Sequence, residues 1–248
     1  MKMQFKASRL MLIVLLVLCT SASAKILVAI PQHPNYSHPK HPGYLNLLIE
    51  EMGEFSNVDF SFLPTQRAIV AHYQEKKYAC LMGGDEELLR MFGSDPKLKY
   101  FSKPHMAHKS HIFSKNQKIC NIEDLTNKSL VVLNSFPHEK FFKNIKLKRV
   151  EKVHSLKQAI RMGVNGRADA FISYFPTPEL LDKDIKFCKE LSFTETSDKI
   201  HCYKSAETLK FIKSWNKRLE KLKKKNKLKS MLEKSFPNRS EEILKQIK

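Results

Sequence analysis

The amino-acid sequence predicts an α/β protein of two lobes, each with a mainly parallel sheet flanked by helices. Two observations support this prediction. Short apolar runs typical of strands alternate with helical patterns along residues 25–84, and the same alternation returns along residues 129–175. Such alternation favours parallel strands joined by helical crossovers. The length of 248 residues suits one or two compact domains.

The first 24 residues are predicted to form a secretory signal peptide. Basic residues precede the apolar run 10–18, and a small-residue stretch ends at Ala24, near which we expect cleavage. The apolar run is too short for a transmembrane helix, which needs about 20 apolar residues. We therefore expect the mature protein to reside in the periplasm.

The first half of the mature chain is predicted to begin with a buried strand, because residues 25–30 ("KILVAI") are apolar and rich in β-branched side chains. Residues 31–44 hold four prolines and a glycine, which exclude a helix or a central strand. A helical pattern follows at 44–52, and Gly53 is placed to end it. The other predicted elements of this half are strands at 58–64 and 78–84, a helix at 65–77 and a helical stretch at 86–90.

The second half repeats this order. Apolar runs predict strands, and the segments between them have helical patterns. Asn165 and Gly166 end a helix and let the chain reverse. The predicted strands lie at 129–134, 147–153 and 168–175, the helices at 135–144 and 155–167, and a final extended segment at 199–204 precedes basic helices.

Four cysteines lie in the mature chain, Cys80, Cys120, Cys188 and Cys202, in a compartment where disulfides persist. Four cysteines allow three full pairings, and the sequence alone does not fix the connectivity. We favour the pairing that contains Cys188–Cys202, because these two residues flank a short polar stretch. A buried free thiol at Cys80 is the alternative.

The chain is strongly basic, with a formal net charge of +19. Much of this charge lies in residues 213–235, where apolar residues recur at helical intervals between lysines. This pattern predicts amphipathic helices whose charged face is solvated. Contact with an anionic membrane surface and long-range attraction of acidic ligands are alternatives. Nucleic acid is not an expected partner of a secreted chain.

Histidines occur at a strict spacing of three in the segment 101–113. If this segment is extended, His105 and His111 lie on one side and His108 on the other, so three imidazoles cannot converge on a metal. A helix beginning at Pro104 would instead place them on one face, where a transition metal would accept them. We expect the extended form, and therefore no metal and no cofactor.

Four stretches carry motifs in a fixed order along the chain. The first leads through a helix and a strand to a glycine-rich loop, and the second holds an aromatic-Ser-x-Pro segment and a "DL-x-x-K" turn. The third holds an "NGR-x-DA" turn, and the fourth forms the closing helices. They read "PTQRAIVAHYQEKKYACLMGGD", "YFSKPHMAHKSHIFSKNQKICNIEDLTNKSLVVLNSF", "VHSLKQAIRMGVNGRADAFIS" and "LEKLKKKNKLKSMLEKSF". Together they resemble the family 3 periplasmic solute-binding proteins, which capture polar amino acids and related small molecules for ABC importers.

The resemblance covers nearly the whole mature chain and implies the type II periplasmic-binding-protein fold, with a ligand cleft between the lobes. It implies that lobe 1 is discontinuous, from 25–105 and 203–248, and that lobe 2 covers 106–202. Hinge segments are expected near 101–111 and 198–204. Small ligands bind preferentially at such interfaces, outside the carboxyl ends of the strands.

Residues near the strand ends of lobe 1 are the first ligand-binding candidates. Arg67, just inside a helix, could hold a carboxylate with two parallel hydrogen bonds, and a solvent-facing position is the alternative. Gly83 and Gly84 would let a ligand approach the backbone amides. Asp85 is a candidate for ligand contact and, alternatively, the N-cap of the next helix.

The next candidates are aromatic or polar residues at positions that the resemblance implies. Tyr36 follows the first strand, where the family commonly places an aromatic residue over the ligand. His105 occupies the place of a family aromatic at the cleft edge, and a solvated rim position is the alternative. Ser135 and Phe136 stand at the corresponding helix start of lobe 2.

Tyr174 is the last candidate and marks a departure from the family pattern. Amino-acid binders often place an Asp after the last strand of lobe 2, where it holds the α-ammonium group of the ligand. They also carry a Thr or Ser closely followed by an Arg after the first cleft loop, whereas this chain offers Arg90 at a different spacing. We therefore expect a small polar or anionic ligand other than an ordinary α-amino acid.

These observations predict a monomeric, non-enzymatic binding protein that captures its ligand for an ABC permease or a membrane sensor. Two alternatives are open. One is a periplasmic enzyme that resembles the cyclohexadienyl dehydratases, with Glu179, Asp85, Glu86 and His105 as candidate acids. The other is a metal-binding protein that uses the histidine-rich segments.

Overall fold

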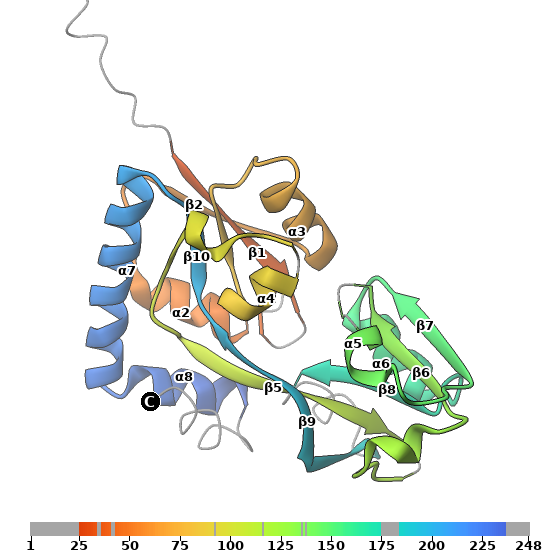
Figure 1. Ribbon diagram of the computed structural model, residues 1–248. Helices are drawn as coiled ribbons and strands as arrows, with labels where there is room; N and C mark the ends of the chain where they lie inside the picture. Colours follow the sequence, from red (N-terminus) through yellow and green to blue (C-terminus); the bar gives the residue numbers. More distant parts are fainter. Residues whose placement is uncertain are drawn as a thin grey trace, which may run out of the picture.

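The structure is a computed structural model that describes residues 25–33, 36–40, 43–91, 93–115, 117–134, 136, 138–174 and 184–236. These residues form two five-stranded sheets, each flanked by helices (Figure 1). Two long neighbouring strands, β5 (Met106–Ser114) and β9 (Lys186–Asp198), extend from one sheet toward the other. The two sheets with their helices are called lobe 1 and lobe 2 below.

The sheet of lobe 1 has three parallel strands and two antiparallel ones. Its described strands are β1 (Ile26–Gln32), β2 (Val58–Pro64), β3 (Cys80–Met82), β4 (Lys99–Phe101) and β10 (Ile200–Tyr203). Their order is β2-β1-β3-β10-β4, with β1 parallel to β2 and β3, and β10 antiparallel to β3 and β4. Since β1 has a strand on either side and helices on both faces, its residues Val28, Ala29 and Ile30 are completely buried. The strand–helix–strand rhythm therefore correctly predicted parallel pairing.

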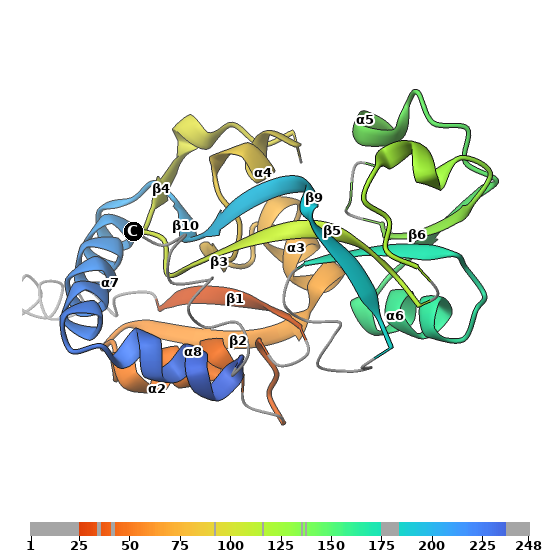
Figure 2. The ribbon, with the colours of Figure 1, turned by 90° about the horizontal axis from the view of Figure 1, so that it is seen from below.

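Helices cover both faces of this sheet. The helices of lobe 1 are α2 (Tyr44–Met52), α3 (Thr65–Tyr73), α4 (Glu86–Met91), η1 (Pro96–Leu98), α7 (Ala206–Lys224) and α8 (Lys227–Ser235). One core joins β1 to α2, α7 and α8 around the fully buried Trp215, and a smaller core with Ala29, Ala68 and Leu81 lies under α3. Figure 2 shows α2 and α8 side by side beneath the strands. The apolar residues of α7 face this core, which confirms the predicted amphipathic helix.

Lobe 2 repeats the pattern of lobe 1. Its described strands besides β5 and β9 are β6 (Ser129–Leu133), β7 (Arg149–Val153) and β8 (Ala170–Tyr174), and its helices are η2 (Ile122–Leu125), α5 (His138–Phe142) and α6 (Leu156–Val164). The strand order is β7-β6-β8-β5-β9, with β6 parallel to β7 and β8. β5 runs antiparallel to both β8 and β9. The predicted strands and helices of this half are confirmed, with bounds that differ by a few residues.

The histidine-rich segment is extended, as expected, because residues 106–114 form β5. His105 is buried in lobe 1, whereas the Nδ1 of His111 lies 2.9 Å from the carbonyl oxygen of Leu191 in lobe 2. A strand rises about 3.3 Å per residue, so six positions separate the two imidazoles by roughly 20 Å along the chain. In the part of the chain that the structure describes, no three His, Cys, Asp or Glu side chains are grouped to hold a metal ion.

The favoured Cys188–Cys202 disulfide is wrong. The disulfides join Cys80 to Cys202 and Cys120 to Cys188, so the alternative of a free thiol at Cys80 is also wrong. Cys80 and Cys202 are direct partners on the adjacent strands β3 and β10. The polar stretch between Cys188 and Cys202 is not a turn but the greater part of β9, and an extended strand carries the two cysteines into different lobes. Each disulfide therefore lies within one lobe, and neither joins the two lobes to each other.

Among the described residues, every helix is too short or too polar to cross a lipid bilayer.

Gly163 lets α6 pack closely against the sheet of lobe 2. A Cβ atom at this position would lie 2.3 Å from a ring carbon of Phe171, a completely buried residue of β8. A glycine in a helix interior normally costs about 0.5–1 kcal/mol relative to alanine, so steric exclusion accounts for its presence here.

We expect Gly163→Ala to lower the free energy of unfolding by about 1–3 kcal/mol, because the new methyl group overpacks the core against Phe171. Urea unfolding measures the change. The control is Lys157→Ala on the exposed side of the same helix, which should change stability by less than about 0.5 kcal/mol. A Gly163→Ala protein more stable than the parent would show that α6 does not pack this closely.

Candidate functional site

The carboxyl ends of β1 and β3 meet the end of β9 at one edge of the lobe 1 sheet. The loop after β3 exchanges two backbone hydrogen bonds with Lys199. The N–H of Gly83 donates to the carbonyl oxygen of Lys199 over 2.9 Å, and the N–H of Lys199 donates to the carbonyl oxygen of Gly84 over 3.2 Å. The backbone N–H of His105, just before β5, donates to Asp198 O over 3.0 Å. The loops that follow the lobe 1 strands and both connecting strands therefore form one hydrogen-bonded unit. Ligands of open α/β folds bind at such strand ends.

The side chain of Asp198 is the centre of this unit. Its Oδ1 accepts a hydrogen bond from Gly84 N over 2.9 Å, and its Oδ2 accepts one from the Tyr36 hydroxyl over 2.5 Å. Only 4% of Asp198 is exposed. A buried carboxylate is stable when such donors surround it. Sequence analysis placed residue 198 in a hinge segment but did not single out its side chain, because the two donors come from loops more than a hundred positions away in the chain.

Three aromatic rings extend from Asp198 into lobe 1. The rings of Tyr36 and Tyr44 are stacked with centroids 5.9 Å apart, and those of Tyr44 and His105 with centroids 6.5 Å apart. The Tyr44 hydroxyl donates to His105 O over 2.6 Å. Burial, and then the Asp198 carboxylate, raise the pKa of Tyr36 and of Tyr44 well above the usual value. Both phenols therefore stay protonated and act as hydrogen-bond donors.

The predicted ligand residues of this edge occupy different depths. Tyr36 is half-buried, but His105 has an exposed fraction of 0% and lies behind it, 3.4 Å from the Tyr36 hydroxyl to Nε2. His105 is therefore not at a solvated rim in this structure. Gly83 and Gly84 have φ values of 117° and 82°, which only glycine adopts readily. Asp85 directly precedes α4, and its carboxylate accepts from Ser197 N of β9 over 3.1 Å.

Arg67 lies on α3 and forms an ion pair with Glu75. Its Nη2 donates to Glu75 Oε2 over 3.0 Å and its Nη1 donates to Oε1, so the pair is bidentate. Half of the Arg67 side chain is exposed. Arg67 is therefore accessible, but a ligand carboxylate would have to compete with Glu75 for the guanidinium.

The corresponding edge of lobe 2 is described in part. Phe136 is 9% exposed and stacks on Phe141, so it belongs to the core of lobe 2. Ser135 lies outside the described residues, and Tyr174 ends β8 with a side chain that is also outside them.

Asn134, which follows β6, is exposed, and its Nδ2 lies 2.9 Å from His154 Nδ1 after β7. These two polar side chains at strand ends were missed, although their position after predicted strands is a signal that could have identified them.

A second cluster of ionisable groups lies between α3 and the β4–β10 edge of lobe 1. His72 Nδ1 lies 2.9 Å from Tyr78 O, which accepts, and His72 Nε2 accepts from Lys99 Nζ over 2.8 Å. Burial, and then Lys99, lower the pKa of His72 to about 3. Burial, and then Lys76, lower the pKa of Lys99 to about 7.

The same cluster includes His201, whose pKa is lowered well below the usual value, first by burial and then by His72 and Lys99. His72, Lys99 and His201 are at most 4% exposed. A lysine with a pKa of about 7 beside two neutral histidines would suit proton transfer, but these three side chains are enclosed in lobe 1. They therefore form an internal polar network of lobe 1.

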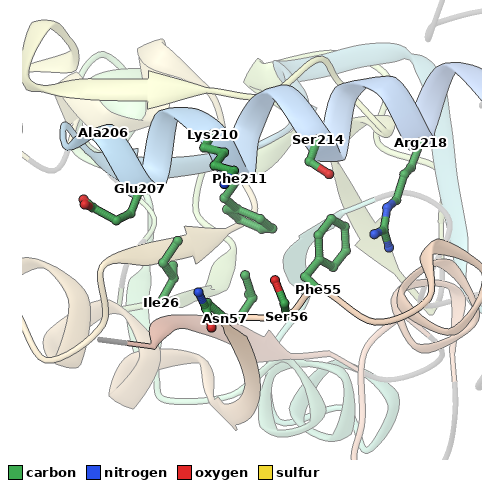
Figure 3. Close-up of a pocket in the computed structure, with 11 residues that line it drawn as sticks. Ile26, Phe55, Ser56, Asn57, Ala206, Glu207, Lys210, Phe211, Ser214 and Arg218 are labelled. Atoms are coloured by element: carbon green, nitrogen blue, oxygen red, sulfur yellow. The ribbon is translucent and has the colours of Figure 1, made fainter. Parts of the chain in front are cut away.

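A pocket of about 400 Å³ lies at the opposite edge of the lobe 1 sheet, where β1 and β2 begin (Figure 3). It is lined by Ile26, Phe55, Ser56, Asn57, Val58, Ala206, Glu207, Lys210, Phe211, Ser214 and Arg218. None of the residues predicted to bind the ligand is among them. The pocket is thus separate from the carboxyl edge described above.

Comparisons with known proteins establish the fold. No protein-family model matches the sequence, and no curated protein matches it. Among solved structures, the chain is similar to the substrate-binding protein of an amino acid ABC transporter, with 16% identity and a TM-score of 0.67 over 87% of this chain and 100% of that one. It is also similar to the GluR0 ligand-binding core of Nostoc punctiforme in complex with L-glutamate, with 17% identity and a TM-score of 0.67 over 85% and 99% of the chains.

A third similar structure is the ancestral amino acid-binding protein AncCDT-1, a precursor of cyclohexadienyl dehydratase, with 21% identity and a TM-score of 0.64 over 86% of this chain and 95% of that one. The two mixed sheets with flanking helices are thus the type II periplasmic-binding-protein fold, that of amino-acid ABC transporter substrate-binding proteins. The predicted fold class is confirmed.

We expect Asp198→Ala to lower the free energy of unfolding by about 3 kcal/mol, because it leaves the Gly84 amide and the Tyr36 hydroxyl without their buried acceptor. The control is Asp59→Ala, which removes an exposed ion pair with Lys25 and should cost less than about 1 kcal/mol. Denaturant unfolding of both variants makes the comparison. Equal losses would argue against a central role of Asp198.

We expect the free energy of unfolding to fall as the pH drops from about 6.5 toward 3, in part through His72. The folded pKa of about 3 lies below the ordinary 6.5, so in this window the unfolded chain binds a proton that the folded chain does not. One such proton contributes a slope of about 1.4 kcal/mol per pH unit. His72→Gln should therefore flatten the pH dependence in urea unfolding, whereas His154→Gln, at an exposed histidine, should leave it unchanged. An unchanged slope for His72→Gln would contradict the assignment.

Proposed function

We propose that this protein is a periplasmic solute-binding protein that captures a small polar or anionic ligand between its two lobes, for an ABC importer or a membrane sensor. One observation carries the proposal. The loops at the carboxyl ends of β1 and β3 share their hydrogen bonds with the connecting strand β9 through Asp198. A ligand that moves these loops would therefore also move the connection between the lobes, which couples binding to hinge rotation.

The connection between the lobes supports a closing motion. β5 and β9 run between the two sheets, and their pairing register shifts between Lys109 and His111 and between His111 and Phe113. Each disulfide lies within one lobe. The lobes can therefore rotate about the paired strands while the core of each lobe keeps its packing. A partner protein in the membrane could distinguish the closed, loaded form from the open one.

The ligand class follows from the side chains near the strand ends and from the similar structures. One of these holds L-glutamate and others are amino-acid binders, which supports a small ligand with a carboxylate. Arg67 offers a cation, whereas the amides of Gly83 and Gly84 already donate to Lys199 O and to Asp198 Oδ1. Tyr174 stands where an ammonium-binding Asp would be expected, and this departure favours an acid without an α-ammonium group.

Binding is better supported than catalysis. Asp85 holds the backbone of Ser197, Glu86 pairs with Lys199 over 2.7 Å, and His105 is completely buried. Asp85 and Glu86 thus hold the segment at the end of β9, and His105 lies in the interior of lobe 1. Glu179 lies outside the described residues. AncCDT-1, the precursor of an enzyme, is itself an amino acid-binding protein. Incubation with a cyclohexadienyl acid tests the alternative, since formation of product would replace the binding role by an enzymatic one.

The test begins with native mass spectrometry of the protein isolated from its periplasm, followed by thermal unfolding with a panel of L-amino acids and small carboxylic acids. We expect a stoichiometric small molecule and a ligand-dependent rise in Tm, because binding to the folded state stabilises it. A panel without any effect, together with an empty protein in the mass spectrum, would refute a solute-binding role.

The role of Arg67 is tested with the acid that this screen identifies. Arg67→Ala should weaken its binding by about tenfold or more, because a charge-assisted contact is lost. Glu75→Gln should strengthen it, because the guanidinium is released from its competitor. Arg149→Ala, which breaks a comparable ion pair with Glu151 in lobe 2, is the control and should have no effect. Equal affinities of all three variants would remove Arg67 from the site.

A further inference from the structure

The pocket at the amino ends of β1 and β2 has the composition of a binding site. Its volume of about 400 Å³ falls within the range of small-molecule sites, about 300–1,000 Å³. β1 is seven residues long and a strand rises about 3.3 Å per residue, so the pocket lies roughly 20 Å from the carboxyl edge of the sheet. Any ligand here would be additional to the one between the lobes.

The floor of the pocket is apolar and packs against the core of lobe 1. Ile26 and Phe211 are buried, and the half-buried Phe55 ring packs edge-on against Phe211, with ring centroids 5.3 Å apart. Phe55 also stacks on Trp215 at 6.0 Å. Figure 3 shows Phe55 and Phe211 facing each other between α7 and the segment that leads into β2. Such a surface is suited to a compact apolar group.

The helical wall of the pocket carries the charge. Lys210, Ser214 and Arg218 follow one another at intervals of four residues on α7, so they lie one above the other on a single face. Figure 3 shows this face directed into the pocket. An anion at the Ser214 hydroxyl would have a cation one helical turn away on either side. Glu207, the acidic residue of the lining, lies two turns from Ser214.

Arg218 is held in place by the fold. Its Nη1 donates to Met52 O over 2.5 Å and to Glu54 O over 2.8 Å, and its guanidinium lies 4.0 Å from the centroid of the Phe55 ring. These contacts fix the group without neutralising its charge, because the two acceptors are backbone carbonyls. A preorganised cation beside an apolar floor loses little entropy when it binds a carboxylate.

We propose that this pocket is a second ligand site, for a small carboxylate that carries a branched or cyclic apolar group. The carboxylate binds at Ser214 between Lys210 and Arg218, and the apolar group lies on Phe55 and Phe211. The proposal goes beyond capture of a ligand between the lobes and does not depend on it.

Cyclohexylacetate is a suitable probe, because it has both groups and does not absorb where tryptophan fluoresces. Trp215 is the one tryptophan in the sequence and contacts both aromatic residues of the floor, so its fluorescence reports on the pocket. We expect saturable binding of cyclohexylacetate at submillimolar to millimolar concentrations. Acetate, which lacks the apolar group, and cyclohexylethylamine, which lacks the anion, should not saturate the fluorescence change. Absence of saturation with cyclohexylacetate would overturn the proposal.

Two variants with the same change of charge locate the site. Lys210→Glu should weaken binding of cyclohexylacetate by about tenfold, because it replaces a cation of the pocket by an anion. Lys213→Glu, at an exposed position of the same helix outside the pocket lining, should bind as the parent does. Equal weakening in both variants would show a general effect of charge and refute the site. Loss of binding in Arg67→Ala with full binding in Lys210→Glu would assign the probe to the edge between the lobes instead.

Discussion

The carboxylate of Asp198 is the contact on which the arrangement of the strand ends depends. It joins the loop after β1, through Tyr36, to the loop after β3, through Gly84, and it does so from the end of a strand that belongs to the other lobe. A buried carboxylate needs nearby donors, and those donors must come from segments that the fold has already assembled. The interaction therefore requires the finished sheet of lobe 1 and also fixes the end of β9 against the loops at its edge.

Each lobe is otherwise self-contained. Lobe 1 has its cores around Trp215 and under α3, and lobe 2 has a core of its own with Phe113 and Phe171 at its centre. The disulfides reinforce this division, since Cys80–Cys202 joins neighbouring strands of lobe 1 and Cys120–Cys188 joins segments of lobe 2. Two separately packed lobes joined by a pair of strands are the arrangement that the proposed closure requires. The pocket beside α7 lies wholly within lobe 1.

Local sequence patterns predicted most of the secondary structure, because hydrophobic periodicity and turn residues act on the backbone within a few positions. The run "KILVAI" became the enclosed strand β1, and Asn165 and Gly166 ended α6 as predicted. The disulfides and the site were predicted less well because they depend on distance in space. The stretch between Cys188 and Cys202 has polar residues typical of a loop, yet β5 pairs with it and makes it a strand. In the same way, Arg67 is paired with Glu75, which lies eight positions away in the segment after α3 and competes with a ligand for the guanidinium.

The sequence by itself determined the class of fold and the order of strands and helices, since hydrophobic periodicity and turn residues act over a few positions. Only the tertiary structure decided the cysteine partners, the burial of His105, the role of Asp198 and the pocket between α7 and the beginning of β2. Each of these depends on groups that are far apart in the chain and become neighbours when the sheets form. No local sequence pattern predicts these contacts, because the packing of whole strands and helices brings the residues together.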